Sequence, residues 1–132
     1  MKYIKLSALF FSAIIPINCI NVVFACEDKS RMLEVTATAY TSSVVETDST
    51  PNISAWGDRL SPGMRVLAVS RDLLAMGLTH GTLVSVEGFE KEFIVLDKMN
   101  KRWKKKIDIY MGNDRNSALE WGKRKVNICW RY

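Results

Sequence analysis

Short stretches of alternating or consecutive apolar residues recur along the chain. Residues 31–40 alternate between apolar and polar side chains, which predicts a half-buried strand. Five further segments have the pattern of short strands, at residues 66–69, 82–86, 93–96, 107–110 and 125–130. Six short strands at this spacing indicate an all-β protein, a small barrel or sandwich, rather than an α/β fold.

Residues 113–121 form the one segment with a clear helical pattern. Asn113 or Asp114 can cap its start, and Gly122 follows its end. Residues 71–78 predict at most one or two helical turns. Residues 41–51 have no periodicity and are rich in Ser and Thr, so we expect a long loop after the first strand, where function is often located.

The first 25 residues predict a secretory signal peptide. An apolar stretch at residues 6–15 follows two lysines, and Val23 and Ala25 are acceptable residues before a cleavage site at Cys26. An uncleaved membrane anchor is the alternative, although one proline and two asparagines interrupt the apolar run. We expect an exported protein of the periplasm or cell envelope, with one domain at residues 26–132.

The two cysteines of that domain leave three alternatives open. Cys26 and Cys129 are an even pair in an exported chain, which favours a disulfide between the two ends. Alternatively, Val-Phe-Ala-Cys is a degenerate lipobox, and lipidation of Cys26 would attach the protein to a membrane. Two free thiols are the third alternative.

The charge of the domain is modest. Its 107 residues carry 17 of the 19 basic side chains and all 14 acidic ones, a net charge of +3. This excess is too small to indicate nucleic acid as a partner, and it fits work near an anionic wall or membrane surface. We expect no metal and no cofactor, because His80 stands alone and zinc-ligand spacing is absent; a divalent site made of aspartates is the weaker alternative.

Two aspartates lie in the apolar strand segments of the second half. Asp97 follows the run Phe93–Leu96, and Asp108 lies within residues 107–110. A carboxylate in such a position is costly to ionise unless it has a partner. Residues 98–106, here called the connector, join the two segments and are basic and aromatic without Gly or Pro. This arrangement suggests a site that acts on a neutral or acidic polymer.

Five blocks of the sequence resemble the 3D domain family, named for three aspartates. They are Thr36-Ala37-Thr38-Ala39-Tyr40-Thr41, Leu67-Ala68-Val69-Ser70, Leu96-Asp97, Ile107-Asp108-Ile109-Tyr110 and Ala118-Leu119-Glu120-Trp121-Gly122-Lys123-Arg124. The family resembles the catalytic barrel of membrane-bound lytic transglycosylase A. The resemblance implies a six-stranded double-psi β-barrel with one late helix, and cleavage of peptidoglycan glycan strands.

Two departures from the family pattern are evident. Ser70 stands where the family carries its first aspartate, with Asp72 two residues further on. A longer basic segment follows Asp97 in place of a small Thr-Gly-Gly-Ala loop. The spacing between the two remaining aspartates is kept, so the resemblance still implies the barrel scaffold.

On this resemblance Asp97 is the predicted acid/base. Its carboxyl would protonate the leaving oxygen of the MurNAc–GlcNAc bond and then accept the proton of the MurNAc 6-hydroxyl, which gives a 1,6-anhydro ring. Asp108 would be its electrostatic partner. The predicted contacts to the peptidoglycan strand come from Tyr40, Asp48, Ser70, Lys98 and Trp103, with Trp56 as a second aromatic candidate.

Each of these roles has a plainer alternative. Asp97 and Asp108 can be carboxylates with a purely structural role. Ser70 can be a polar residue that simply ends a strand, and Asp48 can be the first residue of an Asx-turn. A catalytically silent wall-polysaccharide-binding module, like expansin-like barrels, is the main alternative function. A periplasmic interaction protein with structural aspartates is the third. We expect a monomer in each case.

Overall fold

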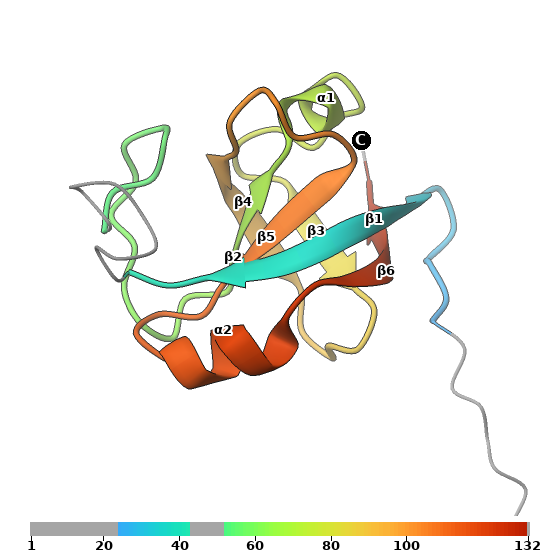
Figure 1. Ribbon diagram of the computed structural model, residues 1–132. Helices are drawn as coiled ribbons and strands as arrows, with labels where there is room; N and C mark the ends of the chain where they lie inside the picture. The colour runs from blue at the N-terminus through green and yellow to red at the C-terminus, as the bar shows by residue number, and fades with distance from the viewer. Residues whose placement is uncertain (1–23, 43–51, 132) are drawn as a thin grey trace, which may run out of the picture.

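The computed structural model describes residues 24–42 and 52–131, which fold into a closed barrel (Figure 1). The six strands are β1 (Arg31–Tyr40), β2 (Val66–Val69), β3 (Leu83–Val86), β4 (Phe93–Lys98), β5 (Lys106–Tyr110) and β6 (Arg124–Trp130). Two helices accompany them, α1 (Arg71–Leu74) and α2 (Arg115–Trp121). All six strands lie where the sequence pattern predicted them, with ends that differ by no more than one or two residues.

The strands follow one another around the barrel in the order β1-β5-β2-β4-β3-β6, and β6 pairs with β1 to close it. β1 is parallel to β5 and β2 is parallel to β4, whereas the other neighbours are antiparallel. β2 therefore lies between β4 and β5, the two strands that carry the aspartates. This closed mixed barrel confirms the predicted all-β, double-psi barrel class.

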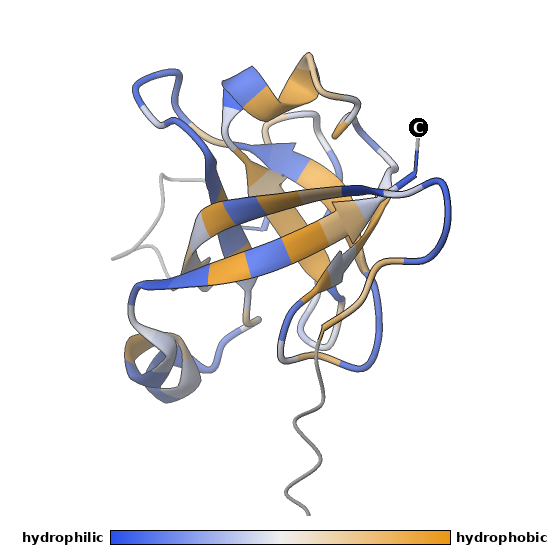
Figure 2. Cartoon of the chain, turned by 90° about the vertical axis from the view of Figure 1, so that its right-hand side faces the viewer, coloured by the Kyte–Doolittle hydropathy of each residue, from blue (hydrophilic) through white to orange (hydrophobic). Residues whose placement is uncertain are grey.

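Alternation along the strands separates an apolar interior from a polar exterior, as the colours of Figure 2 show. Every strand contributes fully or nearly fully buried side chains to the interior, among them Val35, Ala37, Leu67, Val69, Val84, Val86, Phe93, Val95, Ile107, Ile109, Val126, Ile128 and Trp130. Full burial of one such aliphatic side chain is worth about 1.5–3 kcal/mol. The interior is thus a packed core, and function has to reside on the outer faces or in the loops.

The helices are shorter than the sequence pattern suggested. α1 is a single turn whose Leu73 is buried, and it ends at Leu74 rather than near Gly77. α2 begins at Arg115, because the Asp114 carboxylate caps its N-terminus by accepting a hydrogen bond from the Ser117 amide at 3.0 Å. No helix among the described residues is both long and apolar enough to cross a lipid bilayer.

The two ends of the domain are joined covalently. Cys26 and Cys129 form a disulfide with a Cα–Cα distance of 5.7 Å, within the usual range. Because 103 positions separate the two cysteines, the bond restricts the unfolded chain strongly. In this structure the Cys26 sulfur is therefore occupied by Cys129 rather than by a lipid.

Candidate functional site

The outer face of β1, β5, β2 and β4 carries a row of four aligned residues. Thr38 on β1 is paired in register with Asp108 on β5, and Asp108 is paired with Ala68 on β2. Ala68 is in turn paired with Asp97 on β4. The register thus brings both predicted aspartates onto one surface, one on each side of β2.

A local irregularity turns Asp97 toward this surface. The pairing of β2 with β4 shifts by one residue between Leu67 and Ala68, so that Val95 lies beside Leu67 and Asp97 lies beside Ala68. Such bulges redirect side chains and are frequent near functional sites. Without the shift, strict alternation after the buried Val95 would turn Asp97 toward the interior.

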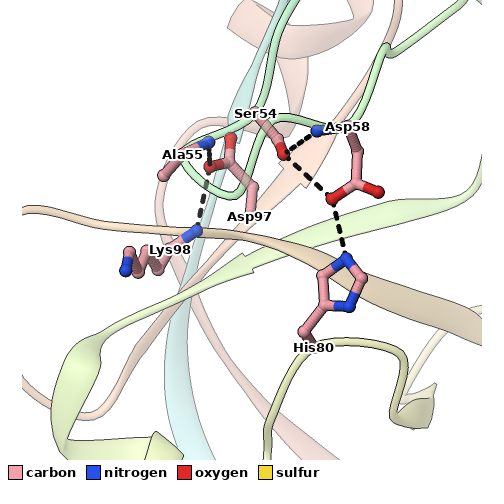
Figure 3. A network of polar contacts seen from close by, with 6 residues as sticks. All are labelled: Ser54, Ala55, Asp58, His80, Asp97 and Lys98. Atoms are coloured by element: carbon pink, nitrogen blue, oxygen red, sulfur yellow. Dashed lines mark hydrogen bonds and ion pairs between the residues drawn. The ribbon is translucent and has the colours of Figure 1, made fainter.

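The Asp97 carboxylate accepts three hydrogen bonds, of which Figure 3 shows the two from Ala55 and Lys98. Its Oδ1 accepts from the backbone amides of Ala55, at 2.7 Å, and Lys98, at 2.9 Å, and its Oδ2 accepts from the Tyr40 hydroxyl at 3.2 Å. The Ala55 bond joins the strand end to a loop 42 residues earlier in the chain. The carboxylate is therefore held in one orientation by groups from three separate segments.

Tyr40 supplies a hydroxyl that remains protonated. Burial raises the pKa of Tyr40 well above its usual value, and the negative charges of Asp97 and Asp108 raise it further. The ring of Tyr40 also packs against Tyr110, with 5.4 Å between the ring centroids. Tyr40 is thus a fixed hydrogen-bond donor between the two aspartates.

Asp108 accepts a hydrogen bond from the Thr38 hydroxyl at 3.0 Å. Asp97 and Asp108 lie on strands separated by β2, so their Cα atoms are roughly 10 Å apart, two strand spacings. The link between the two aspartates that the structure shows is the charge that both exert on Tyr40. The role of Asp108 as electrostatic partner of Asp97 in catalysis remains a prediction from sequence.

A small apolar layer supports this polar face. Leu60, Val66 and Tyr110 are buried there, and Tyr40, Met64, Ile94 and Leu96 pack against them. The layer is separate from the barrel core, because its members belong to the outer side of the strands and to the segment before β2. Tyr40 belongs to this layer and also donates to Asp97, so the layer and the polar face are joined through it.

The loop at residues 52–60, here called the Trp56 loop, borders the face beside Asp97. An isolated bridge between Ile53 and Arg59 closes it. Inside it the Ser54 hydroxyl donates to Asp58 at 3.2 Å, and His80 Nε2 contacts the same Asp58 oxygen at 2.7 Å (Figure 3). Because Ser54 contacts Asp58 rather than His80, this trio lacks the order of a nucleophilic triad and braces the loop.

Trp56 stands next to this brace. Its ring meets His80 edge-on with 5.3 Å between centroids, and the Lys98 ammonium lies 5.1 Å from the centroid of the indole. Lys98 directly follows Asp97, so an aromatic ring, a cation and a carboxylate are neighbours here. From the sequence Trp56 ranks second to Trp103 as an aromatic candidate, whereas the structure links the neighbouring Ala55 amide to Asp97.

Trp103 lies in the connector, at the other side of the aspartate face. The Lys106 ammonium lies 3.8 Å from its ring centroid and the Arg102 guanidinium 4.9 Å from it. The side chain is 37% exposed. Lys106 precedes Asp108 by two positions on β5, so Trp103 borders the face from the side of Asp108.

Two predicted contact residues fall outside this arrangement. Ser70 has no exposed surface, and its hydroxyl accepts a hydrogen bond from the Lys106 amide at 3.0 Å. It therefore joins the end of β2 to the start of β5, and we leave it out of the site. Asp48 lies outside the described residues.

The sequence alone does not identify Thr38, the Ala55 amide, or the pairing of Asp58 with His80 as parts of this face. In the sequence His80 is a lone histidine. Among the described residues, no group of three or more His, Cys, Asp or Glu side chains is arranged to hold a metal ion.

Comparisons with known proteins address the fold. No protein-family model and no curated protein matches the sequence, so membership of the 3D domain family remains a prediction. Solved structures of an expansin from Clavibacter michiganensis match the chain, in the apo form and as an aspartate-to-asparagine mutant in complex with cellohexaose.

Both expansin structures match with a TM-score of 0.51 and 15% sequence identity. Each match covers 77% of this chain and 51% of the expansin chain, so this chain spans about half the length of the structures it matches. At this level of identity the match shows a shared fold.

Proposed function

We propose that this protein is a cell-wall polysaccharide-binding module, and that the outer face around Asp97 and Asp108 is its binding site. The observation that carries the proposal is the fixation of the Asp97 carboxylate by the Ala55 amide. This bond holds an acceptor for sugar hydroxyls and the neighbouring Trp56 ring in one arrangement. Binding sites for small polar ligands commonly combine an apolar surface with a few placed polar groups of this kind.

The fold supports the proposal. The expansin with the shared barrel fold has been solved with cellohexaose, a chain of β-linked sugars. For the present chain we infer a wall polysaccharide as the ligand class, with peptidoglycan glycan strands as the first candidate. That ligand would place the protein in the cell envelope, outside the cytoplasm.

Lytic cleavage of glycan strands is the second candidate function. The position of Asp97 at a strand end, half-buried and next to Tyr40, favours it. A general acid must carry a proton, however, and both oxygens of Asp97 accept hydrogen bonds. We rank binding above cleavage because the expansin with the shared fold has been solved in complex with cellohexaose.

Incubation with isolated peptidoglycan sacculi distinguishes the two functions. The purified protein is mixed with sacculi, and both the co-sedimented protein and the soluble products are measured, the latter by mass spectrometry. We expect retention of the wild-type protein without release of anhydro-muropeptides. The Asp97→Asn variant, which preserves an acceptor at Oδ1 for the two amides, serves as the comparison.

Three outcomes separate the candidates. Retention without products supports the binding module. Anhydro-muropeptides from the wild type but not from folded Asp97→Asn would establish cleavage instead. Absence of both retention and products would contradict both functions for peptidoglycan.

A further inference from the structure

Positive charge is concentrated in one segment of the domain. The connector, residues 98–106, carries six basic side chains and no acidic one: Lys98, Lys101, Arg102, Lys104, Lys105 and Lys106. Residues 26–132 otherwise contain 11 basic and 14 acidic side chains, a net charge of −3. The small overall excess thus conceals a strongly basic loop on a slightly acidic barrel.

The connector is held at both ends by the segment around α1. Arg71 Nε donates to the Met99 carbonyl at 3.0 Å, at its start. At its end the Asp72 carboxylate accepts from the Lys105 amide at 2.9 Å, where the backbone takes a positive φ of 44°. These contacts involve backbone groups of the connector, so its basic side chains are left to point outward.

Two of these cations are positioned by Trp103. The Lys106 ammonium and the Arg102 guanidinium lie 3.8 Å and 4.9 Å from the ring centroid. Cation–π contact restricts both side chains before any ligand arrives, which reduces the entropy lost on binding. Within the described parts of the chain, none of the six cations forms an ion pair with an acidic side chain.

The basic segment is continuous with the aspartate face. Lys98 follows Asp97 on β4 and lies over Trp56, whereas Lys106 precedes Asp108 by two positions on the same face of β5 and lies over Trp103. Each aspartate therefore has a lysine–tryptophan pair beside it. A polymer that crosses the face must pass next to the connector.

We propose that the connector binds carboxylate groups, so that the preferred ligand of this protein is an acidic glycan rather than a neutral one. The inference rests on the proposed polysaccharide-binding function. Sugar hydroxyls would face Asp97 and Asp108, which repel acidic groups, and the carboxylates of the polymer would lie over the connector. The two charge signs on one surface thereby orient the polymer.

Polygalacturonate and its methyl ester of the same chain length test this inference, because the ester keeps the sugar backbone and loses the negative charges. Binding of the purified protein is measured at low ionic strength and again in salt. We expect the acid to bind at least about tenfold tighter than the ester, and this preference to shrink as salt screens the charges.

Two variants with the same change in net charge locate the effect. The connector variant replaces three basic residues of the connector by Gln: Lys101, Arg102 and Lys104. The control variant replaces three exposed lysines elsewhere by Gln: Lys91, Lys123 and Lys125. We expect the connector variant to lose most of the preference for the acid while its affinity for the ester is unchanged. The control variant should behave like the wild type.

Three results would overturn the inference. Equal affinity for acid and ester would refute it and leave the proposed polysaccharide binding intact. An equal loss in both variants would show a general charge effect rather than a connector site. If neither polymer binds, with or without binding to vesicles of phosphatidylglycerol, the acidic-glycan inference fails, and the sacculus experiment decides the proposed function separately.

Discussion

The two loops that border the aspartate face are built in opposite ways. The Trp56 loop is attached to the face itself, since its Ala55 amide donates to the Asp97 carboxylate. Beyond Lys98, whose amide donates to Asp97, the connector is attached from behind, through Arg71 and Asp72. Among the described residues, no side chain of the connector forms a hydrogen bond or ion pair with Asp97. Each loop nevertheless places a tryptophan against a lysine of the face.

This difference suggests a division of labour. A loop that is bonded to a carboxylate fixes the geometry of that carboxylate, and damage to either partner must affect both. A loop that is held only through its backbone can present charge without altering the aspartates. The Trp56 loop should therefore determine whether a glycan binds at all. The connector should determine which glycan is preferred.

The largest effect is expected from removal of the Asp97 side chain. Asp97→Ala deletes the acceptor for the Ala55 and Lys98 amides, so we expect glycan affinity to fall by more than about tenfold and stability by about 1–3 kcal/mol. Asp97→Asn retains an Oδ1 acceptor and should cost less in both respects. Sacculus co-sedimentation and chemical denaturation measure the two quantities. Equal losses in the two variants would contradict the role of Asp97 as the anchor of the loop.

The two tryptophans provide a direct test of the division. Trp56→Leu should weaken binding of the acidic polymer and of its neutral ester alike, by about tenfold. Trp103→Leu should weaken binding of the acidic polymer alone, by about three- to fivefold, because it releases two cations rather than a contact surface. Equilibrium binding to both polymers provides the measurement. A neutral-ester defect in Trp103→Leu would show that the connector contacts sugar rings directly.

Asp72 tests how the connector is held. Although burial opposes the effect, hydrogen bonds from the Ser70 hydroxyl and the Lys105 amide lower the pKa of Asp72. The folded-state pKa is thus below the unfolded value, so the stability it provides is present at neutral pH and is lost as pH falls through the folded-state pKa. We expect Asp72→Asn to cost about 1 kcal/mol at pH 7, because the side chain is partly exposed.

The pH dependence of unfolding checks this expectation. Denaturation curves of the wild type and Asp72→Asn should differ at pH 7 and converge in strong acid, where the wild-type carboxyl is protonated as well. A difference that persists unchanged in acid would show that Asp72 acts through packing rather than through its charge.

The smallest effect is expected at the brace of the Trp56 loop. His80→Gln removes the contact with Asp58, and because the pair is exposed to solvent its loss should cost less than about 1 kcal/mol. Glycan affinity should fall no more than about threefold, since the Ala55 bond to Asp97 remains. Thermal unfolding together with polymer binding measures both. A loss as large as that of Asp97→Ala would make the brace, rather than Asp97, the anchor of the loop.

Local pattern was enough to predict the strands and the aspartates. Alternation and short apolar runs record which side chains face the core, so all six strands and the polar exceptions Asp97 and Asp108 were visible in sequence. Tyr40 and Lys98 were also predicted, because they lie within or next to the same strand segments.

Contacts between distant segments could not be predicted in the same way. No local signal indicates that β2 lies between β4 and β5, or that the Ala55 amide reaches Asp97 across 42 positions. A backbone amide can donate whatever its residue type, so its role leaves no trace in the sequence. Ser70 was predicted to contact the glycan because it stands where the family carries its first aspartate, yet it is fully buried and its hydroxyl accepts from the Lys106 amide.

Chemical-shift mapping tests the central claim, that the face around Asp97 binds glycan. The backbone amides of Ala55 and Lys98 both donate to Asp97, so their resonances, with the Trp56 indole N–H, report on this carboxylate. Titration with a peptidoglycan tetrasaccharide, (GlcNAc–MurNAc)₂, should shift these signals first and most. Shifts confined to a separate pocket, lined by residues that include Ser85, Glu90 and Trp130, or no shifts at saturating sugar, would contradict the account.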